Sequence, residues 1–164
     1  MLYLGADHRG YYLKEAIKKF LKSRQLEFED LGNLHYDKDD DFPDFAKLVA
    51  KKVQEKPKEN QGILICGTGI GMSIASNRFK KVRGALALSA YLARKAKEED
   101  DANIICLASD LTDEATAIRI IKEWLKAKFL DEERFKRRIE KIDEDVILSE
   151  AKDLSRMRGR RECI

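Results

Sequence analysis

Apolar residues in this chain form short continuous runs, which alternate with longer stretches where apolar residues recur every three or four positions. The short runs predict five β-strands, and four of them are apolar enough to be buried on both faces of a parallel sheet. The second run opens instead with alternating apolar and acidic residues. We expect the strands at residues 2–6, 26–32, 62–66, 82–88 and 102–108.

The stretches with helical spacing lie between these strands. Pro43 favours the first turn of one helix, while Ser89 and Thr112 are candidate N-caps of two others. We expect helices at residues 13–21 and 43–53, from about 70, at 90–98 and 113–129, and from about 131. Alternating strands and helices predict a three-layer α/β/α Rossmann-like domain with a five-stranded parallel sheet and a C-terminal helix.

Polar and reactive residues follow several of the predicted strands. Asp7 and His8 follow the first strand, residues 66–71 close the third, Ser89 follows the fourth and Ser109 the fifth. The carboxyl ends of parallel strands meet at one edge of a sheet, and ligands of open α/β sheets bind there. We therefore expect one site at this edge.

The central stretch, residues 62–75, carries the most specific chemistry. Its sequence GILICGTGIGMSIA predicts a buried strand, a glycine loop at residues 67–71 and the start of a helix. Such a junction directs several backbone N–H groups at one point, where an anion could bind. Cys66 stands at the strand end, and a helix N-terminus would lower the pKa of its thiol and make it a usable base or nucleophile. The alternative is a buried structural thiol.

Length and charge favour one domain with a distinct tail. The chain has 164 residues and a net charge of +3. Residues 151–164 hold five basic and two acidic side chains, which leaves residues 1–150 without net charge. We expect a single domain at residues 1–148 and a basic, partly disordered tail at residues 149–164. A neutral domain argues against nucleic-acid binding.

The remaining composition excludes several other classes. No apolar run reaches the roughly 18 residues that a membrane span needs, and the N-terminus is typical of a first strand instead of a signal peptide. We therefore expect a cytoplasmic protein with no membrane partner. Three cysteines without CxxC spacing indicate free thiols, with no disulfide framework and no metal site.

Several motifs together resemble the ribose-5-phosphate isomerase B and galactose-6-phosphate isomerase family. The resemblance rests on GADHRG at residues 5–10, DFPD at 41–44, GILICGTGIGMSIASN at 62–77 and DAN at 101–103, and it covers about residues 2–145. It implies a doubly wound domain and a homodimer, which could pair into tetramers. It also implies active sites that take residues from both subunits, and no metal or organic cofactor.

The resemblance also implies a reaction and its residues. The family interconverts an aldose phosphate and a ketose phosphate by moving a proton between C1 and C2 through an enediolate. By this resemblance Cys66 is the base, Thr68 handles the proton on the substrate oxygens, and Asp7 and His8 bind the sugar. The backbone of the glycine loop and first helical turn would hold the enediolate oxygen. These positions are Gly67, Gly69, Ile70, Gly71, Met72 and Ser73.

Arg134 and Arg138 match the family's phosphate-binding pair. Their i,i+4 spacing places both on one face of a helix, and guanidinium groups bind phosphate with two parallel hydrogen bonds. The alternative is a solvated helix face, because the two arginines lie in a run of basic residues.

The sequence departs from the family pattern at four positions. Glu99 and Asp100 replace a His-Asn pair whose histidine opens the furanose ring, Phe42 replaces a tyrosine, and Asp110 replaces an arginine. Glu99 could move the ring proton, but only burial would raise its pKa enough for a good acid; the alternative is the solvated end of a helix. These departures leave open an isomerase of another sugar phosphate, or a non-catalytic sugar-phosphate-binding homologue.

Two remaining groups have simpler interpretations. The acidic stretch at residues 37–41 lacks the full spacing of a calcium loop and is interpreted as a hydrated connector. Cys106 lies in an apolar strand and is expected in the core.

Overall fold

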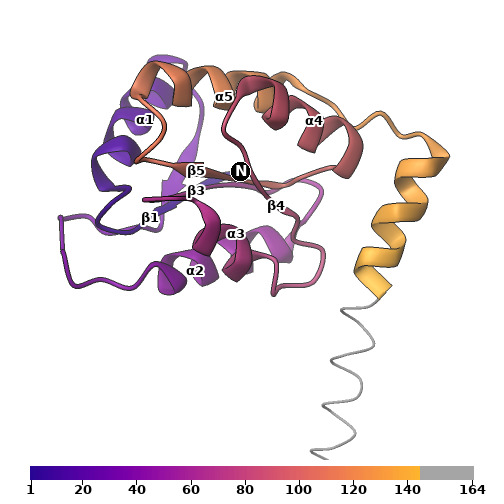
Figure 1. The fold of residues 1–164 in the computed structure, drawn as a ribbon, viewed down its shortest axis with the longest axis horizontal. Coiled ribbons are helices and arrows are strands. Elements are labelled where there is room, and N and C mark those ends of the chain that lie inside the picture. The colour runs from indigo at the N-terminus through magenta and orange to yellow at the C-terminus, as the bar shows by residue number, and fades with distance from the viewer. Residues whose placement is uncertain (145–164) are drawn as a thin grey trace, which may run out of the picture. The chain divides into compact units, whose positions relative to one another are not determined.

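The computed structural model describes residues 1–144, which belong to two units: Met1–Leu130 and a second one that begins at Asp131. The first unit contains the sheet and its helices (Figure 1). In the second, residues 133–144 are helical, which confirms the predicted C-terminal helix. The predicted tail at residues 149–164 lies outside the described residues. Within residues 1–144, no helix is long and apolar enough to cross a membrane.

A five-stranded, all-parallel sheet forms the centre of the first unit, as predicted. Its strand order is β2-β1-β3-β5-β4. The strands are β1 Leu2–Ala6, β2 Phe28–Asp30, β3 Gln61–Cys66, β4 Gly84–Leu86 and β5 Ile104–Ala108. β2 and β4 are shorter than the runs at residues 26–32 and 82–88 predicted. Both are edge strands paired on one side only, so fewer hydrogen bonds hold their ends in extended form.

Five helices cover the two faces of the sheet. They are α1 Tyr11–Ser23, α2 Phe42–Glu55, α3 Ile70–Ser76, α4 Ala90–Asp100 and α5 Glu114–Lys126. Ser89 caps α4 as predicted, since its Oγ accepts the N–H of Leu92 at 3.2 Å. The prediction for Thr112 is wrong: Asp113 caps α5, because its carboxylate accepts the N–H of Thr116 at 2.7 Å. The same helix ends at Lys126 instead of about 129, where Ala127 turns to extended backbone.

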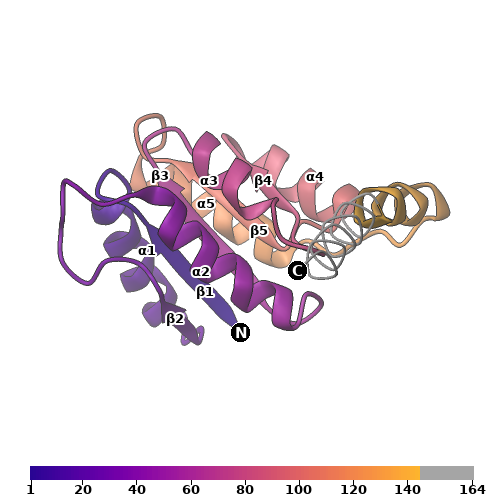
Figure 2. The ribbon, with the colours of Figure 1, turned by 90° about the horizontal axis from the view of Figure 1, so that it is seen from below.

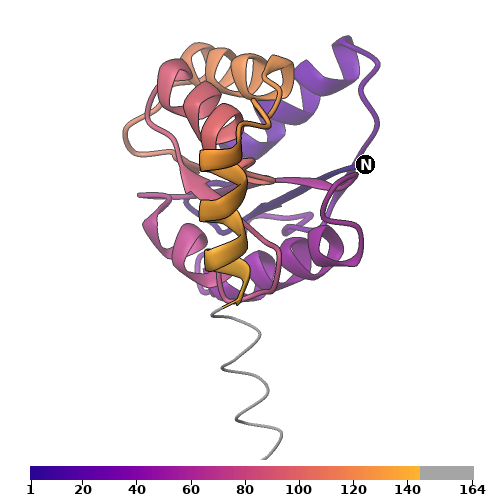
Figure 3. The ribbon, with the colours of Figure 1, turned by 90° about the vertical axis from the view of Figure 1, so that its right-hand side faces the viewer.

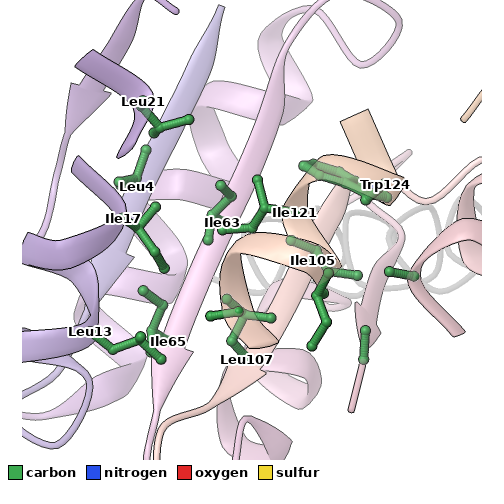
Figure 4. Packing of buried hydrophobic residues seen from close by; sticks show 14 of the residues in the cluster. Leu4, Leu13, Ile17, Leu21, Ile63, Ile65, Ile105, Leu107, Ile121 and Trp124 are labelled. Carbon is green, nitrogen blue, oxygen red and sulfur yellow. The ribbon is translucent and has the colours of Figure 1, made fainter. Parts of the chain in front are cut away.

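The helices form two layers with the sheet between them. Helices α1, α4 and α5 lie on one face, and α2 and α3 lie on the other (Figures 1 and 3). In the first layer, Ile17 of α1 and Trp124 of α5 pack over Leu4, Ile63 and Ile105 of the strands, all without exposed surface (Figure 4). This confirms the predicted three-layer α/β/α architecture. Cys106 is fully buried in the cluster on the opposite face, as predicted for a core residue.

The connections place a ligand crevice between β1 and β3. After β1 the chain turns to the face of α1, whereas after β3 it turns to the opposite face, where α2 and α3 lie in front of the strands in Figure 2. β1 and β3 are neighbours in the sheet. In open α/β sheets, such a switch in direction leaves a crevice outside the carboxyl ends of the two strands, where ligands bind.

Candidate active site

The carboxyl end of β3 holds Cys66 in a defined orientation. The residue is 6% exposed, and the backbone N–H of Gly69 donates a hydrogen bond to its Sγ at 3.1 Å. This bond requires the glycine loop to fold back over the strand end. Gly69 permits that fold with a φ of +71°, a left-handed conformation that other residues adopt only with strain. The loop thus fixes the sulfur beside its own backbone donors.

Further donors come from the first turn of α3. Within residues 1–144, the N–H groups of Ile70 and Gly71 have no hydrogen-bond partner, as expected at the start of a helix. Thr68 is exposed at the tip of the loop. The predicted set also includes Met72, whose side chain is in the core, and Ser73. The Ser73 N–H donates to Gly69 O at 3.1 Å and its Oγ to Gly84 O at 3.0 Å, so both donors serve the fold.

Asp7 shapes the turn that follows β1. Its carboxylate is buried and accepts the N–H of Gly10 at 2.9 Å, while its own N–H donates to the carbonyl of Ile65 at 3.3 Å. Burial raises the pKa of Asp7, against the lowering effect of the Gly10 hydrogen bond. Asp7 therefore ties the end of β1 to β3 directly beside Cys66.

His8 forms a pair with Asp40, which no sequence motif marks as a site residue. Its Nδ1 lies 2.7 Å from Asp40 Oδ1, and its backbone N–H donates to the same oxygen at 3.0 Å. The hydrogen bond to Asp40 raises the pKa of His8. The interpretation of residues 37–41 as a hydrated connector is wrong at Asp40, whose side chain is only 6% exposed. One acid among several in a polar loop carries no pattern that would single it out.

Arg9 and Asp110 form a second pair at this edge. The Arg9 guanidinium is ion-paired with the Asp110 carboxylate, and it lies so close to Gly67 that an added Cβ there would be 2.3 Å from Arg9 Cζ. A phosphate bound near Asp110 would therefore meet a carboxylate whose charge is already paired with a cation. The sequence offers one signal for this pair. Asp110 stands where the family has an arginine, and a nearby arginine such as Arg9 can compensate for that change of charge.

Ser109 follows β5 and forms hydrogen bonds with the segments at the ends of β1 and β3. Its Oγ lies 3.0 Å from the carbonyl oxygen of Arg9 and 3.1 Å from that of Cys66, and its N–H donates to Cys66 O at 2.9 Å. This confirms that the residues after β1, β3 and β5 share one edge of the sheet.

Glu99 and Asp100 lie at the opposite edge within one chain. They end α4, before β5, and in the sheet Ile104 pairs with Gly62 whereas Ala108 pairs with Cys66. The length of β5, about 13 Å, therefore separates them from Cys66. Glu99 is ion-paired with Lys95 at 2.9 Å, and the Asp100 carbonyl accepts from Arg83 Nε at 3.0 Å. A site with Cys66 and Glu99 together needs a second chain.

Arg134 and Arg138 lie together in the second unit. Their guanidinium carbons are 4.5 Å and 5.8 Å from the centre of the Phe135 ring, and Arg134 Nε is 2.8 Å from a carboxylate oxygen of Glu132. Both guanidinium groups thus contact the same aromatic ring, and their phosphate role stays a prediction. Among residues 1–144 no three His, Cys, Asp or Glu side chains are grouped as metal ligands.

Comparison with known proteins identifies relatives that match most of the length of this chain. The family model described as Ribose/Galactose Isomerase matches residues 2–142. The probable ribose-5-phosphate isomerase B of Mycoplasma genitalium is 43% identical over 141 residues, which cover 86% of this chain and 92% of that protein. The ribose-5-phosphate isomerase B of Mycobacterium tuberculosis is 36% identical, with coverages of 87% and 88%.

Solved structures agree with the sequence relatives. The Mycoplasma genitalium ribose-5-phosphate isomerase B, crystallised with bound ribulose-5-phosphate, superposes with a TM-score of 0.84 at 42% identity, over 87% of this chain and 93% of that one. The Clostridium thermocellum ribose-5-phosphate isomerase B superposes with a TM-score of 0.82 at 40% identity, over 87% and 95% of the two chains.

Proposed function

The chain belongs to the ribose/galactose isomerase family and is an aldose–ketose isomerase, and we propose that it interconverts ribose 5-phosphate and ribulose 5-phosphate. The observation that carries the proposal is the position of Cys66, whose sulfur is held by the Gly69 N–H beside the unpartnered N–H groups of α3. The substrate choice is supported by the relatives, which include a structure with bound ribulose-5-phosphate.

The reaction needs a base and a group that stabilises the oxyanion. Cys66 as thiolate removes the proton from C2 of the open-chain aldose, and the electron pair moves through the C1–C2 bond onto the carbonyl oxygen. The resulting enediolate accepts hydrogen bonds from the N–H groups of Ile70 and Gly71. Thr68 moves the proton between the two oxygens, and Cys66 returns its proton to C1. Each device contributes on the order of 10² to 10⁴ in rate.

The remaining substrate contacts are proposed from two subunits. Asp7 and His8 bind the sugar from the same chain as Cys66. Arg134 and Arg138 of a second chain hold the phosphate, and Glu99 and Asp100 of that chain reach the sugar. The opposite positions of Cys66 and Glu99 in one chain support this shared site, because a homodimer can bring them together.

A substrate panel tests the proposed function. We expect the protein to isomerise ribose 5-phosphate with a higher kcat/KM than other five- and six-carbon aldose phosphates, and Cys66→Ala to abolish turnover. Cys106→Ala is the matched control, since it removes a buried thiol from the neighbouring strand and should retain activity. Full activity of Cys66→Ala would contradict the proposed chemistry, and a preferred hexose phosphate would contradict the proposed substrate.

A further inference from the structure

His8 lies at the mouth of the proposed site. The N–H of the preceding Asp7 is bonded to Ile65, and the guanidinium of the following Arg9 lies against Gly67. Both neighbours of His8 thus touch the segment that carries Cys66. Consecutive Cα atoms are about 3.8 Å apart, so the His8 backbone lies within one residue step of both contacts.

Among residues 1–144, Nδ1 of the His8 ring has a hydrogen-bond partner and Nε2 has none. Its Nδ1 lies 2.7 Å from Asp40 Oδ1, and in such a pair the carboxylate oxygen accepts the proton on Nδ1. The same oxygen accepts the His8 backbone N–H at 3.0 Å, which fixes the ring relative to its own backbone. This leaves Nε2 to exchange a proton with a ligand, and the side chain is 28% exposed. A histidine oriented by a carboxylate is a recurring acid–base device.

A second set of contacts holds Asp40 in place. The Asn33 side-chain amide donates to Asp40 Oδ2, and the Asn33 carbonyl accepts from Lys14 Nζ. Lys14 has no exposed surface and is anchored by Asp30 at 2.9 Å. The carboxylate is therefore supported on both oxygens, and its support reaches into the buried part of the domain.

We propose, on the basis of the proposed function, that His8 opens the furanose ring of the aldose phosphate and that Asp40 positions it. An aldopentose 5-phosphate closes through its C4 hydroxyl, whereas the isomerisation needs the free aldehyde. In the opening step His8 Nε2 takes the proton from the C1 hydroxyl, and the C1–O bond becomes the carbonyl. The bond between C1 and the ring oxygen breaks with its electron pair on that oxygen, which then receives the proton from Nε2.

Two other candidates fit this step less well. Glu99 is ion-paired with Lys95 at 2.9 Å, and within one chain it lies at the opposite edge of the sheet from Cys66. His35, the other histidine of the chain, is exposed on the loop after β2. His8 combines a strand-edge position with a fixed ring.

The test separates ring opening from proton transfer at carbon. Ribulose 5-phosphate cannot form a furanose, since its C5 oxygen carries the phosphate. Deuterium incorporation at its C1 in D2O therefore reports the Cys66 step without ring opening. We expect His8→Gln to lower the ratio of ribose 5-phosphate isomerisation to this exchange by at least about tenfold. His35→Gln is the matched control, and its ratio should equal that of the wild type.

Asp40→Asn tests the positioning role through pH. Asp7, Asp40 and Arg9 are the charged groups that act on His8, and the Tyr36 ring contacts its edge. Removing the Asp40 charge lowers the pKa of His8, so the acid limb of kcat/KM for ribose 5-phosphate should move to lower pH. A merely structural role of Asp40 would reduce activity without moving this limb.

Each outcome decides between the alternatives. An equal loss of isomerisation and exchange in His8→Gln, or a loss in neither, would overturn the inference, as would a selective drop in Glu99→Gln instead. A wild-type protein that exchanges no deuterium and isomerises no sugar phosphate would overturn the proposed function itself, and this inference with it. A selective drop in His8→Gln and an unchanged His35→Gln support the proposal.

Discussion

At the scale of single residues, Lys14 is a lysine without exposed surface whose ammonium group lies among acceptors. Its Nζ is 3.0 Å from Asp30 Oδ1 and 2.9 Å from Oδ2, and it also donates to the Asn33 carbonyl. Removing one partner of a buried ion pair leaves the other charge uncompensated, which is usually more costly than the net value of the pair.

We therefore expect Lys14→Met to lower the free energy of unfolding by about 3 kcal/mol, measured by urea denaturation. The matched control is Lys18→Met, which removes the second lysine on Asp30. The Lys18 side chain is 18% exposed, so its loss should cost less. Equal stability of Lys14→Met and the wild type would contradict a structural role for the buried pair.

The same pair predicts a dependence of stability on pH. Burial alone would raise the pKa of Asp30, but hydrogen bonds from Lys18, Lys14 and the Gly32 N–H lower it below its usual 3.8. This stabilisation is complete above the unfolded pKa and is lost as the pH falls through the folded value. Between pH 5 and about pH 3, the wild type should lose more unfolding free energy than Asp30→Asn. Parallel curves would show that Asp30 is not the responsible group.

The functional role of a residue could be predicted only where a pattern in the local sequence indicates it. Cys66 was identified because glycines surround it, and Asp7 and His8 because a strand ends before them. Asp40 and Arg9 were missed as site residues because their roles depend on contacts with His8 and Gly67, and each pair brings together residues that are far apart in sequence. Such contacts form only in the tertiary fold, so no regular spacing of residues in the local sequence predicts them.

At the scale of elements, the strand-to-helix junction at residues 66–70 depends on one glycine. Gly69 has a φ of +71°, and an added Cβ would lie 2.6 Å from Leu86 Cδ1 and 3.0 Å from Leu107 O. A side chain there would strain the backbone and displace the loop from β4 and β5. The same residue donates the hydrogen bond to Cys66 Sγ.

Gly69→Ala should therefore lower both stability and activity. The left-handed conformation alone costs about 1 to 2 kcal/mol for a residue with Cβ. We expect a loss of at least that size in urea denaturation and a fall in kcat on ribose 5-phosphate, because the N–H moves away from the sulfur. A variant with normal kcat would show that this N–H is not needed to orient Cys66.

Helix starts and strand ends differ in how well they can be predicted. Ser89 was predicted because an N-cap is a local signal, whereas Thr112 and Asp113 are adjacent and both chemically able to cap α5. The ends of β2 and β4 depend on pairing with β1 and β5, which a local apolar run does not encode. The inner strands were predicted closely because burial on both faces makes their runs continuous.

At the scale of the whole molecule, the proposed shared site predicts complementation between inactive chains. Cys66→Ala and the double variant Arg134→Ala with Arg138→Ala should each be inactive as homodimers. A heterodimer of the two has one site with both Cys66 and the arginines. Random pairing of equal amounts should therefore restore about one quarter of wild-type activity.

A second pairing controls for nonspecific recovery. Gly69→Ala damages the same loop as Cys66→Ala, so a heterodimer of these two chains has no complete site and should stay at the level of its parents. A mixture of Cys66→Ala with the arginine variant that also stays inactive would show that each chain carries its site alone.

The most direct measurement is deuterium incorporation at C1 of ribulose 5-phosphate in D2O, followed by NMR. This exchange requires only a base at the carbon and stabilisation of the enediolate. We expect the wild type and Cys106→Ala to exchange the C1 proton at similar rates, and Cys66→Ala to lose at least about 10²-fold. Exchange by Cys66→Ala at the wild-type rate would show that the thiol at the end of β3 is not the base.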